Sequence, residues 1–171
     1  MQQVAQSETS IDQVITPEYL VQHWQGHRRL TRKVIEAFPE DALFNYSVGG
    51  MRPFAEMVME FIDMGKPGMA GIVTGEWPSI DAVSQHKDSL GKKNKQELLA
   101  IWDEVTDHID NLWTQIPEGR FQVIEKAFGL YEDRIIGTLL YFIDNEIHHR
   151  GQGYVYLRSL GIEPPAFWDR Y

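Results

Sequence analysis

The sequence predicts an all-α protein, a four-helix bundle with one long crossover connection. Apolar residues recur at helical spacing in four segments of the 171-residue chain, and capping signals mark the limits of most of these segments. No segment alternates apolar and polar residues as a half-buried strand does, which favours a bundle over every β class. We find no domain boundary, so we predict a single domain over 1–171 whose residues 1–15 form a loose N-terminal arm.

The first two predicted helices have recognisable start signals. Thr16-Pro17-Glu18 combines an N-cap hydroxyl, a proline at the first helical position and an acid in the first turn. We therefore predict a helix over 17–38. Pro53 starts a second helix in the same way, and Gly65 with Pro67 is expected to end it.

A long connection and a third helix follow. Residues 66–93 are rich in Gly, Pro and Ser and show no periodicity, which predicts a crossover across one end of the bundle with a short helix near 80–85. Asn94 and Glu97 have the spacing of a capping box, so we predict that the third helix begins there.

The last helix is predicted over about 133–160, after an ambiguous stretch at 118–131 that could hold a short extended piece. Gly151 and Gly153 weaken this helix locally. Its predicted apolar face has seven members: Ile136, Leu139, Leu140, Ile143, Ile147, Tyr154 and Leu157.

Composition excludes several classes of function. The formal net charge of −9 repels phosphate, so we expect no nucleic-acid partner. The sequence has no cysteine, which removes disulfides, thiolate metal ligands and a cysteine nucleophile. No apolar run reaches the roughly 20 residues that a membrane span requires, and the N-terminus lacks the pattern of a secretory signal. We therefore expect a cytoplasmic protein without a membrane partner.

Two histidine pairs and one glutamate are the candidates for chemistry. His23 and His27 are four residues apart on one helical face, where they could chelate a metal. Alternatively, His27 is a buried, hydrogen-bonded core histidine and His23 lies at the rim. His148 and His149 diverge by about 100° on a helix and must find separate partners. Glu60 borders an apolar stripe, so its carboxylate should pair with a metal or with an arginine such as Arg52.

The run from Asn145 to Gln152, NEIHHRGQ, is followed by YVYLRSLGIEPP and resembles the last helix of the DinB/YfiT superfamily. The segment Gly50–Glu60, GMRPFAEMVME, resembles the second helix of the same superfamily. The resemblance implies a four-helix bundle, often a homodimer, in which three histidines of many members hold a divalent metal.

Carried over by position, the metal ligands implied by the resemblance are Glu60, Asn145 and His149, with His27 or Glu146 as additional helpers. An oxygen-rich set of this kind suits zinc, nickel or manganese. The implied function is that of a metal-dependent hydrolase or thiol transferase acting on a small molecule. The alternative is a non-enzymatic, stress-associated bundle, either a dimer or a small-molecule-binding protein, whose metal site is degenerate.

Overall fold

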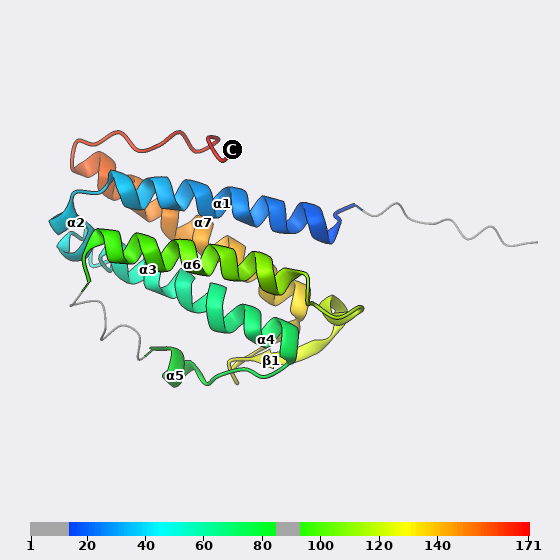
Figure 1. Cartoon of the computed structure of the whole chain (residues 1–171). Coiled ribbons are helices and arrows are strands. Elements are labelled where there is room, and N and C mark those ends of the chain that lie inside the picture. Colours follow the sequence, from blue (N-terminus) through cyan, green and yellow to red (C-terminus); the bar gives the residue numbers. More distant parts are fainter. Residues whose placement is uncertain (1–13, 85–92) are drawn as a thin grey trace, which may run out of the picture.

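A computed structural model describes residues 14–84 and 93–171, which form a bundle of long helices (Figure 1). The long elements are α1 (Pro17–Ala37), α3 (Phe54–Asp63) with its continuation, α6 (Lys95–Trp113) and α7 (Ile135–Ser159). α1 packs against α6 and α7, and α3 packs against the same two helices. The predicted all-α bundle is therefore confirmed. Most of the predicted N-terminal arm lies outside the described residues.

Local sequence signals set the limits of α1 and α6. The Thr16 hydroxyl accepts a hydrogen bond from the Tyr19 N–H at 3.1 Å, and Pro17 occupies the first turn. In α6 the Asn94 side chain accepts from the Glu97 N–H while the Glu97 carboxylate accepts from the Asn94 N–H, both at 2.9 Å. Each cap satisfies helix donors that otherwise have no partner.

The prediction that Gly65 and Pro67 end the second helix is wrong. α3 continues through a π-helical turn, η1 (Met64–Gly68), into α4 (Met69–Thr74). Gly75, with φ 80°, ends this continuous helical rod of α3, η1 and α4. The wider turn accommodates the proline that an α-helix would exclude. Gly68 allows close packing, since a Cβ there would lie 2.7 Å from the Phe142 ring.

The connections contain small elements that the sequence only partly indicates. α2 (Glu40–Asn45) follows α1 and was not predicted, whereas α5 (Ile80–Ser84) lies where a short helix is expected in the crossover. The ambiguous stretch before α7 contains the turn η3 (Arg120–Gln122) and an antiparallel hairpin of β1 (Ile124–Ala127) and β2 (Tyr131–Arg134).

The predicted apolar face of α7 is partly wrong. Leu140 and Ile147 are 42% and 36% exposed. Glu146 and Arg150 are 1% and 6% exposed instead, because the middle of α7 turns polar side chains toward α1 and α3. None of the helices in the described part of the chain is both long enough and apolar enough to cross a bilayer.

The two glycines of α7 should respond oppositely to alanine. A Cβ on Gly153 would lie 2.6 Å from the Phe54 ring, whereas a Cβ on Gly151 meets no atom within 4 Å. We expect Gly153→Ala to lower the free energy of unfolding by about 1–3 kcal/mol through overpacking. Gly151→Ala should raise it by roughly 0.5–1 kcal/mol. Urea denaturation of both variants checks this, and destabilisation by Gly151→Ala would contradict it.

Candidate metal centre

Glu60 of α3 meets Asn145 and His149 of α7 at one point inside the bundle. The His149 Nε2 atom lies 3.6 Å from Glu60 Oε1, and Asn145 Nδ2 donates to the same oxygen at 2.9 Å. Arg52, just before α3, donates to Glu60 Oε2 at 2.6 Å. Three side chains from two distant parts of the sequence therefore share one carboxylate.

The helical spacing of α7 creates this meeting. Asn145 and His149 are one turn apart, so both side chains project toward α3. The His149 ring packs beside Phe61, with ring centroids 6.0 Å apart. Its Nδ1 atom lies 2.9 Å from Gln152 Oε1, an oxygen that only accepts hydrogen bonds. The Nδ1–H therefore points at Gln152, and the Nε2 lone pair of a neutral His149 faces Glu60.

The cluster shifts the protonation of both partners. Burial opposes ionisation of Glu60, but contacts with His149, Arg52 and Asn145 outweigh it and lower the pKa of Glu60 to about 2. The Glu60 carboxylate raises the pKa of His149, against the effect of burial. The gap between the two acceptor atoms is thus a place for a cation, either a proton on His149 or a metal ion.

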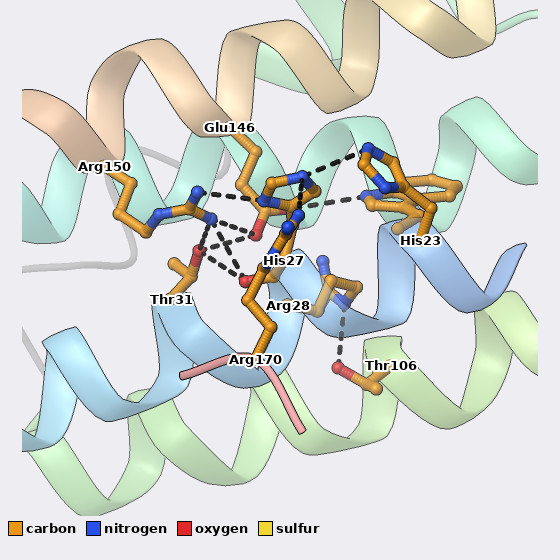
Figure 2. A network of polar contacts seen from close by, with 9 residues as sticks. His23, His27, Arg28, Thr31, Thr106, Glu146, Arg150 and Arg170 are labelled. Atoms are coloured by element: carbon orange, nitrogen blue, oxygen red, sulfur yellow. Dashed lines mark hydrogen bonds and ion pairs between the residues drawn. The ribbon is translucent and has the colours of Figure 1, made fainter. Parts of the chain in front are cut away.

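A second polar network lies between α7 and α1 (Figure 2). Buried Glu146 accepts hydrogen bonds from Trp24 Nε1 at 3.2 Å and from the Thr31 hydroxyl at 2.6 Å. Arg150 lies 3.8 Å from the same carboxylate and donates to the His27 carbonyl at 3.2 Å. The buried Glu146–Arg150 pair is thereby satisfied within the fold.

His27 is buried in this second network, and its partners are nitrogen atoms. Its Nδ1 lies 2.9 Å from Arg150 Nη2, and its Nε2 lies 3.2 Å from His23 Nε2 and 3.1 Å from Arg170 Nη1. Burial first, and then the charges of Arg150 and its neighbours, lower the pKa of His27 to about 3. His27 is therefore neutral at physiological pH.

The C-terminal segment adds Arg170 to the network by lying along α1 (Figure 1). Arg29 donates to the Arg170 carbonyl at 2.9 Å, and Lys33 pairs with the Asp169 carboxylate at 2.7 Å. The tail is therefore held at several points beside His27.

The structure divides the predicted ligands between these two places. Glu60, Asn145 and His149 come together. Within the described residues, no side-chain hydrogen bond or ion pair joins His27 or Glu146 to any of those three, and both belong to the second network. Gln152 and Arg52 complete the site. The sequence offered Arg52 only as an ion-pair partner, and Gln152 only as the end of the NEIHHRGQ run.

Glu60 also lines a cavity of about 670 Å³ between α3, α5, the hairpin and α7. Ile80 and Val83 of α5 and Phe142 of α7 are among its apolar lining residues. A cavity of this size is within the range of small-molecule sites. The Glu60 cluster is therefore at the border of a space that a small ligand could enter.

The sequence matches the DinB family over residues 1–170. The chain belongs to the DinB family. Its fold is similar to the crystal structure of a DinB-like protein, YjoA, from Bacillus subtilis, with a TM-score of 0.66 and 19% sequence identity over 87% of this chain and 96% of that one. No curated protein sequence matches the chain. The resemblance and the fold are thus confirmed, whereas metal, substrate, homodimer, absence of a nucleic-acid partner and cytoplasmic location stay predictions.

The donors at the positions that the resemblance implies have a spacing that suits a divalent ion, with one weak member. Zinc ligands lie about 2.0–2.2 Å from the ion, so two ligands of a tetrahedral site are about 3.4 Å apart, close to the 3.6 Å between Glu60 Oε1 and His149 Nε2. Asn145 Oδ1 is buried without a hydrogen-bond partner, and rotating the amide brings this oxygen toward Glu60. No group of three His, Cys, Asp or Glu residues that could hold a metal gathers within 14–84 and 93–171, and at this point the third donor is an amide.

The Glu60–His149 pair should give the metal-free protein a distinctive pH dependence. The lowered pKa of Glu60 stabilises the fold above pH 4.5, and this contribution is lost as pH falls toward 2. The raised pKa of His149 stabilises the fold below pH 6.5, and this contribution is lost as pH rises through the folded-state pKa. The stability difference between wild type and Glu60→Gln should therefore be largest between pH 4.5 and 6.5, on the order of 1–2 kcal/mol.

Chemical denaturation in EDTA at several pH values checks this difference. The depressed pKa of His27 also makes stability depend on pH, but it is common to both proteins and cancels in the comparison. A difference that stays constant from pH 3 to 8 would contradict the assignment.

Glu146 should contribute to the stability of the fold. Glu146→Gln leaves the buried Arg150 guanidinium without its carboxylate, so we expect a loss of about 3 kcal/mol in unfolding free energy. The matched control is Asp144→Asn, an exposed neighbour, which should change stability by less than about 0.5 kcal/mol. Equal stability of the two variants in urea would refute the structural role.

Proposed function

We propose that this DinB protein binds one divalent metal ion through Glu60 and His149, with Asn145 as a weaker third ligand. The observation that supports this most directly is the pair of acceptor atoms, Glu60 Oε1 and His149 Nε2, 3.6 Å apart. Gln152 directs the Nδ1–H of His149 away from this pair, which is how metal-binding histidines are oriented in proteins.

The surrounding residues prepare the ligands for this role. Arg52 holds Oε2 of Glu60 and leaves Oε1 directed toward His149. Phe61 packs against the His149 ring and limits its rotation. One carboxylate oxygen and one amide oxygen beside one imidazole nitrogen favour zinc or manganese over softer ions. These contacts hold Glu60 and His149 in place before any ion arrives, whereas the Asn145 amide would rotate to present its oxygen.

The cavity beside Glu60 gives such an ion access to a small molecule. A bound divalent ion would supply Lewis acidity, which lowers the pKa of a water or thiol. This chemistry suits the metal-dependent hydrolases and thiol transferases that the DinB resemblance implies. The apolar wall formed by Phe142 and its neighbours would hold the body of the substrate, while Glu60 stands at the border of the cavity.

A metal-free, small-molecule-binding protein is the second candidate, and the contact with Arg52 favours it. The guanidinium neutralises Glu60 at 2.6 Å, and a protonated His149 would complete a closed ion-pair cluster. In that case the cluster fixes the packing of α3 on α7, and the cavity alone carries the function.

Metal content separates the two candidates. We expect protein purified without a histidine tag, then loaded with Zn²⁺ or Mn²⁺ and desalted, to retain about one ion per chain by elemental analysis. His149→Ala should lose the ion, because it removes the strongest ligand. His148→Ala is the matched control, since this neighbouring histidine is exposed and should retain full metal content.

Isothermal titration with the same ions gives the affinities. Wild-type protein that retains no ion, or a His149→Ala variant that binds as tightly as wild type, would reject the metal site. The metal-free candidate would then be the better account of the cluster.

A further inference from the structure

The nitrogen atoms around buried His27 outnumber the groups that can accept a hydrogen bond from them. Arg150 Nη2 lies 2.9 Å from His27 Nδ1, and Arg170 Nη1 lies 3.1 Å from His27 Nε2 (Figure 2). A guanidinium nitrogen only donates hydrogen bonds, whereas a neutral imidazole offers one N–H and one lone pair. In either tautomer of His27, one of the two guanidinium groups therefore faces an N–H and finds no acceptor on the ring.

Arg170 has a further donor without an acceptor. Its Nε atom is buried and has no hydrogen-bond partner among the described residues. His23 does not supply the missing acceptor, because its Nε2 atom lies 3.2 Å from the same His27 nitrogen that Arg170 contacts. Buried N–H groups without a partner are rare in folded proteins and often mark the place of a bound ion or water. The histidine–arginine cluster, formed by His23, His27, Arg150 and Arg170, therefore lacks an acceptor.

The charges around the histidine–arginine cluster are unbalanced as well. Four cationic side chains come together from α1, α7 and the tail: Arg29, Lys33, Arg150 and Arg170. Of the nearby carboxylates, Glu146 already accepts from its own partners, and Asp169 pairs with Lys33. The exposed Asp144 acts on His23, yet burial and then Arg170 keep the pKa of His23 below its ordinary value. The cations therefore exceed the carboxylates here, although the whole chain has a formal net charge of −9.

The cluster is reachable from solvent. His23 and Arg170 are partly exposed, whereas His27 and Arg150 are buried. An acceptor oxygen about 2.9 Å from both His27 Nε2 and Arg170 Nη1 can receive a hydrogen bond from each, because these two nitrogens are 3.1 Å apart. Arg150 then donates to the lone pair on His27 Nδ1. One anion at this point thus provides the acceptor that the four side chains lack among themselves.

We infer that the histidine–arginine cluster binds a small oxyanion, the phosphate or carboxylate group of a small molecule, between α1, α7 and the tail. An oxyanion only accepts hydrogen bonds, and its charge strengthens those from a guanidinium. Its further oxygen atoms are available to the other N–H groups of Arg170. Because Arg170 belongs to the tail, binding of the anion also holds the tail against α1. The inference does not depend on the proposed metal site, which lies where α7 meets α3.

Three simple anions serve as probes: sulfate, phosphate and acetate, each as the sodium salt. In EDTA at pH 7.5, we expect isothermal titration to show saturable binding of at least one of them, with a Kd below about 1 mM. Sodium chloride injected at the same ionic strength is the blank for general charge screening. Tighter binding of sulfate and phosphate assigns the cluster to a phosphate group, whereas tighter binding of acetate assigns it to a carboxylate group.

Variants of Arg170 locate the binding without touching the metal ligands. Arg170→Gln removes the guanidinium group and should weaken binding of the anion at least tenfold. Arg170→Lys keeps the charge but not the guanidinium N–H groups, so it should weaken binding at least threefold. Arg134→Gln is the matched control, because this exposed arginine precedes α7 and lies about 24 Å along the helix from Arg150. Thermal unfolding verifies that each variant is folded.

Any of four results would overturn the inference. The first is that none of the three oxyanions binds beyond the chloride blank. The second and third are wild-type affinity in Arg170→Gln or in Arg170→Lys, and the fourth is an equal loss of affinity in Arg134→Gln and Arg170→Gln. The titrations are done in EDTA, so failure of the proposed metal site would leave the anion result intact, and failure of anion binding would leave the metal result intact.

Discussion

The fold depends on the way α7 buries charged groups on two sides at once. One side directs Glu146 and Arg150 at α1, where Trp24 and Thr31 complete their hydrogen bonds. The other side directs Asn145 and His149 at Glu60 of α3. Buried charges without partners would cost several kcal/mol each, so the helix can take this position only when both neighbours supply matching groups. The polar contacts thus specify the rotation of α7 in a bundle that apolar packing alone would leave less defined.

A similar device joins α1 to α6. The buried guanidinium of Arg28 lies over the Trp102 ring, 3.8 Å from its centroid, and donates to the Trp102 carbonyl. It also donates to the Thr106 hydroxyl (Figure 2). No carboxylate of the described residues forms an ion pair with it, and burial lowers the pKa of Arg28 to about 10. α1 therefore carries polar anchors toward two different helices, which fixes its position between them.

The sequence predicted the features that depend on local chemistry. Thr16 and Asn94 cap their helices with their own side chains, and those contacts need nothing from the rest of the chain. The prediction that the second helix ends near Pro67 was wrong because the π-helical turn that tolerates this proline is stabilised by packing across the bundle. Ile147 was predicted to be buried because hydrophobicity favours an isoleucine in the core. The structure buries the neighbouring Glu146 instead, and the partners of Glu146 lie more than a hundred residues away in the sequence. Glu60 and His149 could be paired only through a family resemblance, and the contact between Gln152 and His149 needed coordinates.

The π-helical turn η1 between α3 and α4 also sets how the side chains of α4 are rotated about the helix axis. A turn of this kind contains one residue more than an α-helical turn, so it rotates the far half of the rod by about 100° relative to the near half. In this orientation Met69 and Ile72 are buried in the core, and Gly71 lies directly under the Trp77 ring. The near half meanwhile keeps Glu60 directed at α7. One additional residue in the helix therefore lets α3 and α4 present two differently oriented faces, with Glu60 directed at α7 and Gly71 directed at the Trp77 ring.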